Sequence, residues 1–193
     1  MPLLAIEGID KAGKDTQARL LEEKMAQKKC AVKRLSFPDY ETPLGKEIKK
    51  FLLGKISLRP EVRQLLYVAN RWERENDMVH WLEKGAFVIA DRYIPSGLAY
   101  GIANGLSLNW MLRLEEGLPK TNVVILVDIP VEVSLSRGRK GDIYEEDREL
   151  LIKVRKSYQE LAQKFNWITV NGEADVEEVF KAIWKDVASR FKI

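Results

Sequence analysis

A glycine-rich segment close to the N-terminus limits most tightly what this chain can fold into. Gly8, Gly13 and Lys14 match the spacing of a phosphate-binding loop, which is glycine, four residues, glycine and lysine. The apolar run 3–6 before the loop predicts a buried strand, and residues 16–28 after it predict a helix. In that setting the glycines let backbone N–H groups turn toward phosphate oxygens, and the helix N-terminus adds partial positive charge. The segment therefore predicts a nucleotide phosphate site, with Lys14 supplying charge to the outer phosphates.

Asp15 departs from the usual loop, because Ser or Thr normally stands there and offers a hydroxyl to magnesium. A carboxylate also suits the octahedral oxygen shell of Mg²⁺, and the first turn of a helix favours negative charge. Thr16 cannot take over, because neighbouring residues on a helix point about 100° apart. We expect Asp15 to contact the metal directly or through one water. The alternative is a carboxylate turned outward as a partner of the helix dipole or as a cap.

The composition is that of an ordinary soluble protein of 193 residues, which is enough for one domain with a buried core. The net charge is +3 and the basic residues are spread along the chain, so a nucleic-acid-binding patch is not indicated. The single cysteine, Cys30, excludes an internal disulfide and suits a reducing compartment. No N-terminal signal segment and no apolar run of about 20 residues is visible. We expect a cytoplasmic protein that binds neither membrane nor nucleic acid.

Along the rest of the chain, apolar strand-like runs alternate with segments of helical periodicity. Strands are expected at 3–6, 30–36, 87–90, 123–127 and 167–170. Helices are expected at 16–28, 41–53, 60–84, 95–102, 108–116, 130–137, 145–165 and 176–191. This alternation predicts an α/β fold with a parallel sheet covered by helices on both faces.

Polar side chains follow three of the expected strands. They are the glycine loop, the segment 37–39 (Phe-Pro-Asp) and the segment 91–93 (Asp-Arg-Tyr). In parallel α/β sheets, ligands bind beyond the carboxyl ends of the strands. We therefore expect these three segments to converge on one binding site.

Several short motifs, in their order and spacing, form a set. They are the glycine loop with Asp10, Phe37-Pro38, the run 69–73 (Ala-Asn-Arg-Trp-Glu), the run 91–93, Ser96 and Tyr100. Together they closely resemble the thymidylate kinase family over nearly the full chain. The resemblance implies a P-loop NTPase fold with a five-stranded parallel sheet. It also implies a single domain, 1–193, with a short lid at about 137–146. Such a protein would transfer the γ-phosphoryl group of ATP to dTMP with Mg²⁺, giving dTDP and ADP, and would be a homodimer.

The resemblance implies roles on the phosphate side of the site. Lys14 corresponds to the lysine of the β- and γ-phosphates, and Arg92 to the arginine that grips the acceptor phosphate. Lys11 is placed to assist transfer, with a solvated loop-tip lysine as the alternative. Asp91 would hold the magnesium shell through water, or would simply pair with Arg92. The expected ATP contacts are Gly8, Ile9, Asp10, Lys11, Ala12, Gly13, Lys14, Asp15, Thr16 and the lid residue Arg137.

The resemblance also implies the contacts of the acceptor nucleotide. Tyr67 and Arg71 share one helix face by their spacing, and would stack on thymine and donate to its carbonyl. Asp10 would orient the deoxyribose end, unless it only stabilises a turn. Tyr100 would crowd a 2′-hydroxyl, with core packing as the alternative. The expected acceptor contacts are Asp10, Phe37, Pro38, Tyr67, Arg71, Arg92, Ser96 and Tyr100.

Three positions depart from the family pattern. Tyr40 and Ile143 stand where the family often has arginines, and Gly101 where a polar residue often helps to read the base. Together with Asp15, these departures keep two alternatives open. One is a kinase of broader nucleoside monophosphate specificity, and the other is a nucleotide-binding regulator that transfers no phosphate. The resemblance also implies a lid function for Arg137, Arg139 and Lys140.

Overall fold

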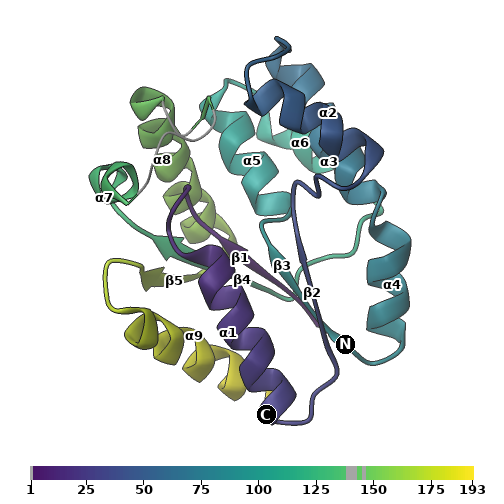
Figure 1. The fold of residues 1–193 in the computed structure, drawn as a ribbon, viewed down its shortest axis with the longest axis vertical. Coiled ribbons are helices and arrows are strands. Elements are labelled where there is room, and N and C mark those ends of the chain that lie inside the picture. The colour runs from purple at the N-terminus through teal and green to yellow at the C-terminus, as the bar shows by residue number, and fades with distance from the viewer. Residues whose placement is uncertain (1, 138–142, 145–146) are drawn as a thin grey trace.

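A computed structural model of the protein describes residues 2–137, 143–144 and 147–193 (Figure 1). Five parallel strands form one sheet in the order β2-β3-β1-β4-β5. They are β1 (Leu3–Glu7), β2 (Val32–Ser36), β3 (Phe87–Asp91), β4 (Val123–Asp128) and β5 (Ile168–Asn171). The predicted parallel α/β sheet is confirmed.

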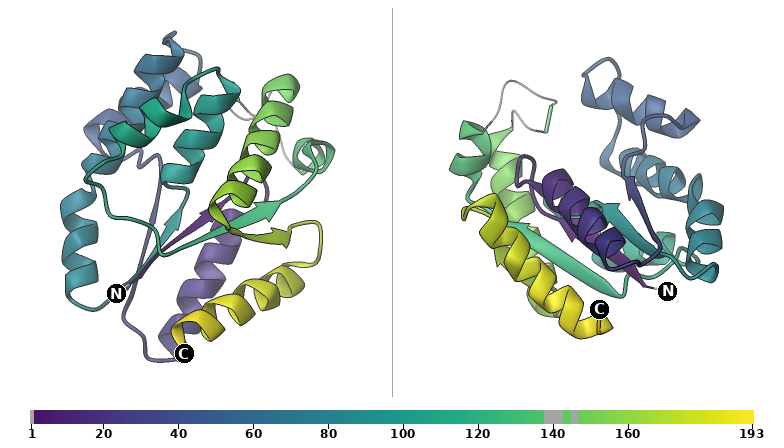
Figure 2. Two further views of the ribbon diagram at one scale, coloured as in Figure 1. Left: turned by 180° about the vertical axis from the view of Figure 1, so that it is seen from behind. Right: turned by 60° about the horizontal axis from the view of Figure 1, so that its bottom comes forward.

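Helices cover both faces of this sheet. The described helices are α1 (Lys14–Gln27), α2 (Pro43–Leu52), α3 (Pro60–Trp72), α4 (Glu75–Glu83), α5 (Ile94–Ala103), α6 (Leu108–Leu114), α7 (Val131–Ser136), α8 (Arg148–Phe165) and α9 (Val176–Phe191). Helices α1 and α9 lie on one face, and α4, α5 and α8 lie on the other (Figure 2). Helices α2 and α3 rise above the carboxyl ends of the strands, beside α5 (Figure 1).

The central strand β1 is buried on both sides, which explains its unbroken apolar run. Leu4 and Ile6 pack in a cluster with Leu21 of α1, whereas Leu3 packs with Met78 of α4 on the opposite face. Because strand side chains alternate between faces, a strand between two helical layers needs apolar residues at every position. Fully burying each such leucine or isoleucine contributes about 1.5–3 kcal/mol.

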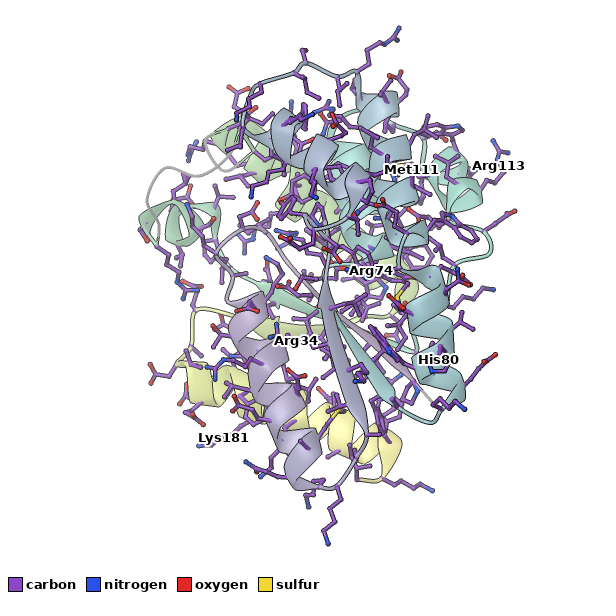
Figure 3. The ribbon with its side chains drawn as sticks, turned by 45° about the vertical axis from the view of Figure 1, so that its right-hand side comes forward. Arg34, Arg74, His80, Met111, Arg113 and Lys181 are labelled. Atoms are coloured by element: carbon purple, nitrogen blue, oxygen red, sulfur yellow. The ribbon has the colours of Figure 1, made fainter. Side chains whose placement is uncertain are left out.

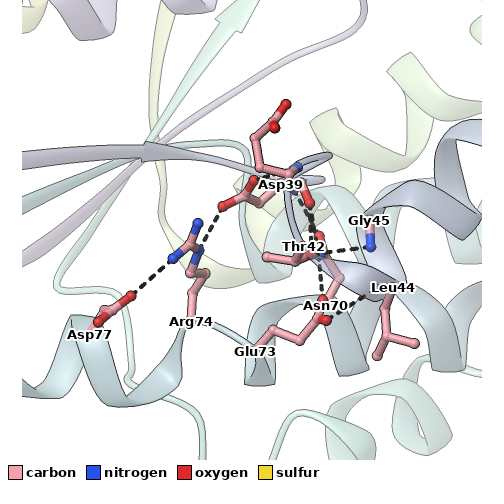
Figure 4. Close-up of polar contacts among 9 residues, drawn as sticks. Asp39, Thr42, Leu44, Gly45, Asn70, Glu73, Arg74 and Asp77 are labelled. Carbon is pink, nitrogen blue, oxygen red and sulfur yellow. Dashed lines mark hydrogen bonds and ion pairs between the residues drawn. The ribbon is translucent and has the colours of Figure 1, made fainter.

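The expected long helix 60–84 is wrong, because the chain forms two helices, α3 and α4. The apolar spacing continues through the junction, so periodicity alone hides the break. At the junction Arg74 has φ −112° and ψ 2°, which is not helical. Figure 3 shows Arg74 at this point and His80 on α4, and Figure 4 shows that Arg74 pairs with Asp39 and Asp77. The bend places α3 above the strand ends and returns α4 to the sheet.

The register of the strands brings the three polar segments together. Asp91 of β3 lies opposite Ile6 of β1 and also opposite Ser36 of β2. The glycine loop after β1, the segment after β2 and Arg92 after β3 therefore leave the sheet at the same level. The expected convergence of these segments is confirmed.

Two expectations fall partly outside the described residues. Most of the lid, 137–146, including Arg139 and Lys140, lies outside them, as does the expected helix start at residue 145. Within the described part of the chain, no helix is both long and apolar enough to cross a membrane.

Candidate active site

The glycine loop is curled, and its shape requires both of its glycines. Gly8 has φ +143°, and a Cβ there would lie 2.4 Å from the carbonyl oxygen of Val127 on β4. Gly13 has φ +92° and precedes the first turn of α1. Residues other than glycine rarely adopt such positive φ angles. The curled backbone is the shape needed to direct amide groups at phosphate oxygens.

Lys14 is buried beneath the loop. Its Nζ donates to the carbonyl oxygen of Ile9 at 2.8 Å. Burial lowers the pKa of Lys14 to about 8, and Arg92 adds to the shift while Asp10 and Asp91 oppose it. The ammonium group is therefore held, poorly solvated, in a place that an anionic ligand would stabilise.

Arg92 connects the end of β3 to the loop. Its Nη1 donates to the carbonyl oxygen of Gly8 at 3.0 Å and to Ser96 Oγ at 3.1 Å, and its Nη2 pairs with Asp10. Arg92 has φ +64°, a conformation that non-glycine residues seldom adopt. A strained backbone held in place by surrounding contacts is common at functional sites.

Asp10 is ionised throughout the physiological range. Burial pushes its pKa upward, but the charges of Arg92 and Lys14 and a hydrogen bond from Tyr100 outweigh burial and lower the pKa to about 2. The Tyr100 hydroxyl donates to Asp10 Oδ2 at 2.7 Å. Asp10 therefore acts as a fixed acceptor of hydrogen bonds, and the alternative of a merely turn-stabilising aspartate does not describe its contacts.

Glu7, at the end of β1, organises the same cluster from below. Its carboxylate accepts from the backbone N–H of Tyr93 at 2.8 Å, from Ser96 Oγ at 2.6 Å and from the hydroxyl of Tyr158 at 3.1 Å. Burial raises the pKa of Glu7, and the hydrogen bond from Ser96 and the charge of Arg92 oppose the rise. Sequence reasoning missed Glu7, although a carboxylate closing an apolar strand was a usable signal.

A first cavity lies between the loop and the ends of β2 and β3, and we call it the loop cavity. It is lined by Asp10, Lys11, Gly13, Lys14, Asp15, Thr16, Ser36, Phe37, Pro38, Tyr40, Asp91 and Arg92. Most of the expected ATP contacts and Asp91 thus lie around one space, whereas Gly8, Ile9, Ala12 and Arg137 do not border it. Its cationic and amide groups suit phosphates.

Asp91 fits a bound magnesium ion. Its Oδ1 is buried and has no hydrogen-bond partner among the described residues. Burial raises the pKa of Asp91, and the nearby charge of Lys14 opposes that rise. The described ion pair of Arg92 goes to Asp10, not to Asp91. An orphaned carboxylate oxygen beside the loop cavity suits Mg²⁺ or its water shell. Among the described residues, no group of three or more His, Cys, Asp or Glu is arranged so that it could hold a metal ion by itself.

The carboxylate of Asp15 is engaged by Arg34 of β2. Arg34 Nη1 lies 2.8 Å from Asp15 Oδ1, and its Nε lies 2.9 Å from Glu22 Oε2. The Asp15 side chain is 71% exposed, and Arg34 lies beside α1 (Figure 3). An exposed ion pair of this kind contributes about 0–1 kcal/mol, so it is easily broken. Metal binding by Asp15 stays a prediction, and a metal ion would have to compete with Arg34 for the Asp15 carboxylate.

A second cavity, which we call the tyrosine cavity, adjoins the first. It encloses about 570 Å³ including its open mouth, and is lined by Asp10, Phe37, Pro38, Tyr40, Leu52, Tyr67, Asn70, Arg71, Arg92, Tyr93, Ser96, Gly97, Tyr100 and Tyr144. Every expected acceptor residue borders it. Tyr144 covers it, with its ring 5.2 Å from that of Tyr100 and 5.7 Å from that of Phe51.

Phe37, Pro38 and Tyr40 border both cavities. Hydrogen bonds from α3 and the residue after it hold the segment 37–44 in place. Asn70 Oδ1 accepts from the backbone N–H of Asp39 at 2.9 Å, and its amide donates to Thr42 Oγ1 at 2.7 Å (Figure 4). Glu73 accepts from the backbone N–H of Leu44 at 3.1 Å. These bonds fix the position of Phe37 and Pro38 relative to α3.

Arg71 is bound to a partner that sequence reasoning missed. Its guanidinium makes a two-point ion pair with Glu115, which follows α6, and Nε lies 3.0 Å from Oε2. Both side chains are almost completely buried. Such a pair fixes the direction of the remaining guanidinium N–H groups. Arg71 therefore reaches the tyrosine cavity in a set orientation.

Comparison with known proteins identifies the relatives of this chain. A family model for thymidylate kinase matches residues 6–183. The chain belongs to the thymidylate kinase family. The thymidylate kinase of Schizosaccharomyces pombe is 34% identical over 186 residues, which is 94% of this chain and 89% of that protein. The probable thymidylate kinase of Pyrococcus abyssi is 38% identical over 192 residues, which is 93% of this chain and 92% of that protein.

A solved structure carries the same family name. The thymidylate kinase of Candida albicans, whose structure is described as revealing the origin of broad substrate specificity, aligns with a TM-score of 0.87 at 30% identity. The alignment covers 98% of this chain and 92% of that chain. The five-stranded P-loop fold implied by the family resemblance is confirmed.

The three departures from the thymidylate kinase pattern have distinct surroundings. Tyr40 borders both cavities, with Lys49 Nζ 5.8 Å from its ring centre. Ile143 donates its backbone N–H to the carbonyl oxygen of Leu52 at 3.1 Å. Gly101 does not border the tyrosine cavity. A Cβ there would lie 2.1 Å from Met111 Sδ. Close packing of α5 on α6 therefore accounts for this glycine.

Arg137 joins the start of the lid to the loop. Its guanidinium donates to the carbonyl oxygen of Gly172 at 3.0 Å and to that of Lys11 at 3.4 Å. Lys11 has φ +61° at the tip of the loop. Ser134 of α7 donates to the carbonyl oxygen of Asp10 at 2.8 Å. Helix α7 thus positions Arg137 against the glycine loop.

Proposed function

We propose that the two cavities hold the two substrates of this enzyme, with the donor phosphates in the loop cavity and the acceptor nucleotide in the tyrosine cavity. As a member of its family the chain transfers the γ-phosphoryl group of ATP to dTMP, giving dTDP and ADP. The observation that carries this placement is that both cavities are lined by Asp10, Phe37, Pro38, Tyr40 and Arg92. Donor and acceptor phosphates can therefore meet there.

On the donor side, the loop amides and Lys14 bind the β- and γ-phosphates. Phosphoryl transfer depends mainly on positioned cations, because charge spreads over the transferred group. Lys14 is already pre-placed and poorly solvated, so a phosphate stabilises its charged form. Lys11 at the loop tip and Arg137 at the start of the lid supply further positive charge. Arg137 lies close enough to bond to the loop backbone.

Asp91 and Asp15 are the residues we propose for magnesium. A bound Mg²⁺ would neutralise part of the phosphate charge. The unpartnered Oδ1 of Asp91 supports a role for that residue. Asp15 borders the same cavity and can turn inward once the weak pair with Arg34 opens.

On the acceptor side, Arg92 and Ser96 hold the phosphate of dTMP. Asp10, fixed by Arg92 and Tyr100, orients the deoxyribose end, and Tyr100 lies where it restricts space for a 2′-hydroxyl. Tyr67 stacks on the base, and Arg71 donates to a base carbonyl. These roles place apolar rings around the base and cations at the phosphate.

We further propose a single cytoplasmic domain, 1–193, that functions as a homodimer with a lid at 137–146. The support for dimerisation is an apolar stripe on α3, where Val62, Leu65 and Trp72 are 41%, 48% and 42% exposed. Contiguous exposed apolar residues often mark protein–protein contacts. Sedimentation of the wild type and of Leu65→Lys tests this: a dimer that becomes a monomer supports it, and a monomeric wild type contradicts it.

A coupled assay of ADP formation tests the proposed function. The full chain is given ATP, Mg²⁺ and one acceptor at a time from dTMP, dUMP, dGMP and dCMP. We expect ADP to form fastest with dTMP, and reaction products to contain dTDP in equal amount. Absence of ADP with every acceptor would support a nucleotide-binding regulator instead. Equal rates with all four would support a kinase of broad specificity.

A further inference from the structure

Gln64 of α3 is a buried polar side chain without a visible task. Its exposed fraction is 3%, and its Nε2 has no hydrogen-bond partner among the described residues. Buried amide groups are normally paired, because an unmade hydrogen bond in a low-dielectric surrounding is costly. An unpaired buried amide close to a ligand cavity therefore suggests a partner that arrives with the ligand.

Gln64 lies on the same face of α3 as the two proposed base-contact residues, although it does not itself border the tyrosine cavity. Gln64, Tyr67 and Arg71 are three and four residues apart, so they lie on one face of α3. Opposite them, a Cβ on Gly97 would lie 3.1 Å from Gln64 Nε2 and 3.0 Å from Arg71 Nη2. Gly97 itself borders the tyrosine cavity. Because Gly97 has no side chain, the Gln64 amide and the Arg71 guanidinium both lie close to its backbone, at the edge of the cavity that Arg71 and Gly97 border.

Two glycines of α5 lie close to the two polar atoms of the Gln64 amide. A Cβ on Gly101 would lie 3.3 Å from Gln64 Oε1, just as one on Gly97 would approach the nitrogen. Gln64 also lines a small cavity together with Tyr67, Tyr100 and Tyr144, which are shared with the tyrosine cavity. The amide therefore presents its nitrogen toward Gly97 and its oxygen toward Gly101.

Arg71 and Gln64 differ in the hydrogen bonds that they can make. Arg71 can only donate hydrogen bonds, so it recognises a base carbonyl but not the ring nitrogen beside it. An amide carries a donor and an acceptor side by side. With its nitrogen toward Gly97 and its oxygen toward Gly101, the Gln64 amide can donate to a carbonyl and accept from the neighbouring N–H, which is the edge that thymine, uracil and guanine share. Reading cytosine would need the amide reversed. Cytosine and adenine instead present an amino group and a ring nitrogen without hydrogen.

We propose that Gln64 is a specificity-determining residue that reads the carbonyl and adjacent N–H of the acceptor base through the gap at Gly97. The inference rests on the proposed placement of the acceptor in the tyrosine cavity. It predicts that the protein prefers dTMP and dUMP to dCMP, and that removing the amide weakens that preference.

The test uses Gln64→Met, which keeps the length and removes both hydrogen-bonding groups. Dissociation constants of dTMP and dCMP are measured by calorimetry on the full chain, together with KM and kcat for dTMP. We expect the preference for dTMP over dCMP to fall by about tenfold or more, since one lost hydrogen bond changes affinity by about that factor. The loss should appear in KM, with kcat little changed.

Gln17→Met is the matched control, because Gln17 is equally buried and lies on α1, where its amide donates to Val176. The preference of the Gln17→Met protein for dTMP over dCMP should stay at the wild-type value. If Gln64→Met does not fold, Gln64→Asn withdraws the amide by one methylene and should lose the same preference. An unchanged preference in a folded Gln64 variant overturns the inference alone. A wild type that binds neither nucleotide overturns the inference and the proposed function together.

Discussion

Arg92 and Asp10, 82 residues apart in the chain, form an ion pair at the junction of the loop cavity and the tyrosine cavity. The same guanidinium donates to Gly8 and Ser96, so the end of β3 and the glycine loop share one cation. In the proposed arrangement, this single arginine sets the position at which an acceptor phosphate faces the donor.

The first prediction concerns the geometry of that arginine. Arg92→Lys keeps the charge but loses the planar fork that engages two groups at once. We expect kcat/KM for dTMP to fall about ten- to a hundredfold, because a charged hydrogen bond is worth ~1.5–3 kcal/mol. Tyr40→Arg, which adds a cation at the border of both cavities, should restore part of the loss. Wild-type kinetics in Arg92→Lys would place the acceptor phosphate elsewhere.

The second prediction concerns Arg71 and its buried partner. Arg71→Ala should raise KM for dTMP far more than KM for ATP, and it also leaves Glu115 buried and unpaired. That isolated charge should lower the free energy of unfolding by about 3–5 kcal/mol. The double variant Arg71→Met with Glu115→Gln should recover most of the stability but not the KM for dTMP. Equal changes in both KM values would make Arg71 a structural residue.

The third prediction concerns Asp15. If it contacts magnesium, Asp15→Ala should require much more Mg²⁺ for nucleotide binding, whereas Asp15→Ser should behave like the wild type. Arg34→Met, which frees the carboxylate, should lower the Mg²⁺ requirement. Fluorescence titration of a nucleotide analogue against Mg²⁺ measures all four proteins. Superimposable curves for the wild type and Asp15→Ala would exclude Asp15 from the metal site.

The fourth prediction concerns pH. The pKa of Lys14 is about 8 in the free protein, and bound phosphate must raise it. Below pH 8 the lysine is charged in both states, so ATP affinity should be flat with respect to this group. Above pH 8 binding takes up a proton, so affinity should fall by at most about tenfold per pH unit. Lys14→Arg stays charged and should show no such fall; a fall of the same size would assign the titration to another group.

Much of this site follows from local patterns in the sequence. The glycine loop, Arg92 and Tyr100 were predictable because their spacing and their places after strands or on a helix are properties of short segments. The break between α3 and α4 was not, because apolar spacing continues through it. Arg74 at the break contacts Asp39, which is 35 residues away in the chain.

The partners of the site residues were also beyond sequence reasoning. Glu7 binds Ser96 across 89 residues, and Arg71 binds Glu115 across 44. Arg34, which pairs with Asp15 of α1 and would compete with a metal ion for its carboxylate, lies on β2. Which charged groups meet depends on the register of strands and the packing of helices, and one sequence contains no direct record of those distances.

The placement of the acceptor phosphate at Arg92 is tested most directly by a binding cycle. Affinities of dTMP and of thymidine, which lacks the phosphate, are measured by calorimetry for the wild type and for Arg92→Met. We expect dTMP to bind the wild type much more tightly than thymidine does. In Arg92→Met that advantage should shrink by about tenfold or more, and because dTMP and thymidine share the deoxyribose contacts of Asp10, a change at Asp10 cancels in the ratio of the two affinities. An advantage of undiminished size in Arg92→Met would contradict the account.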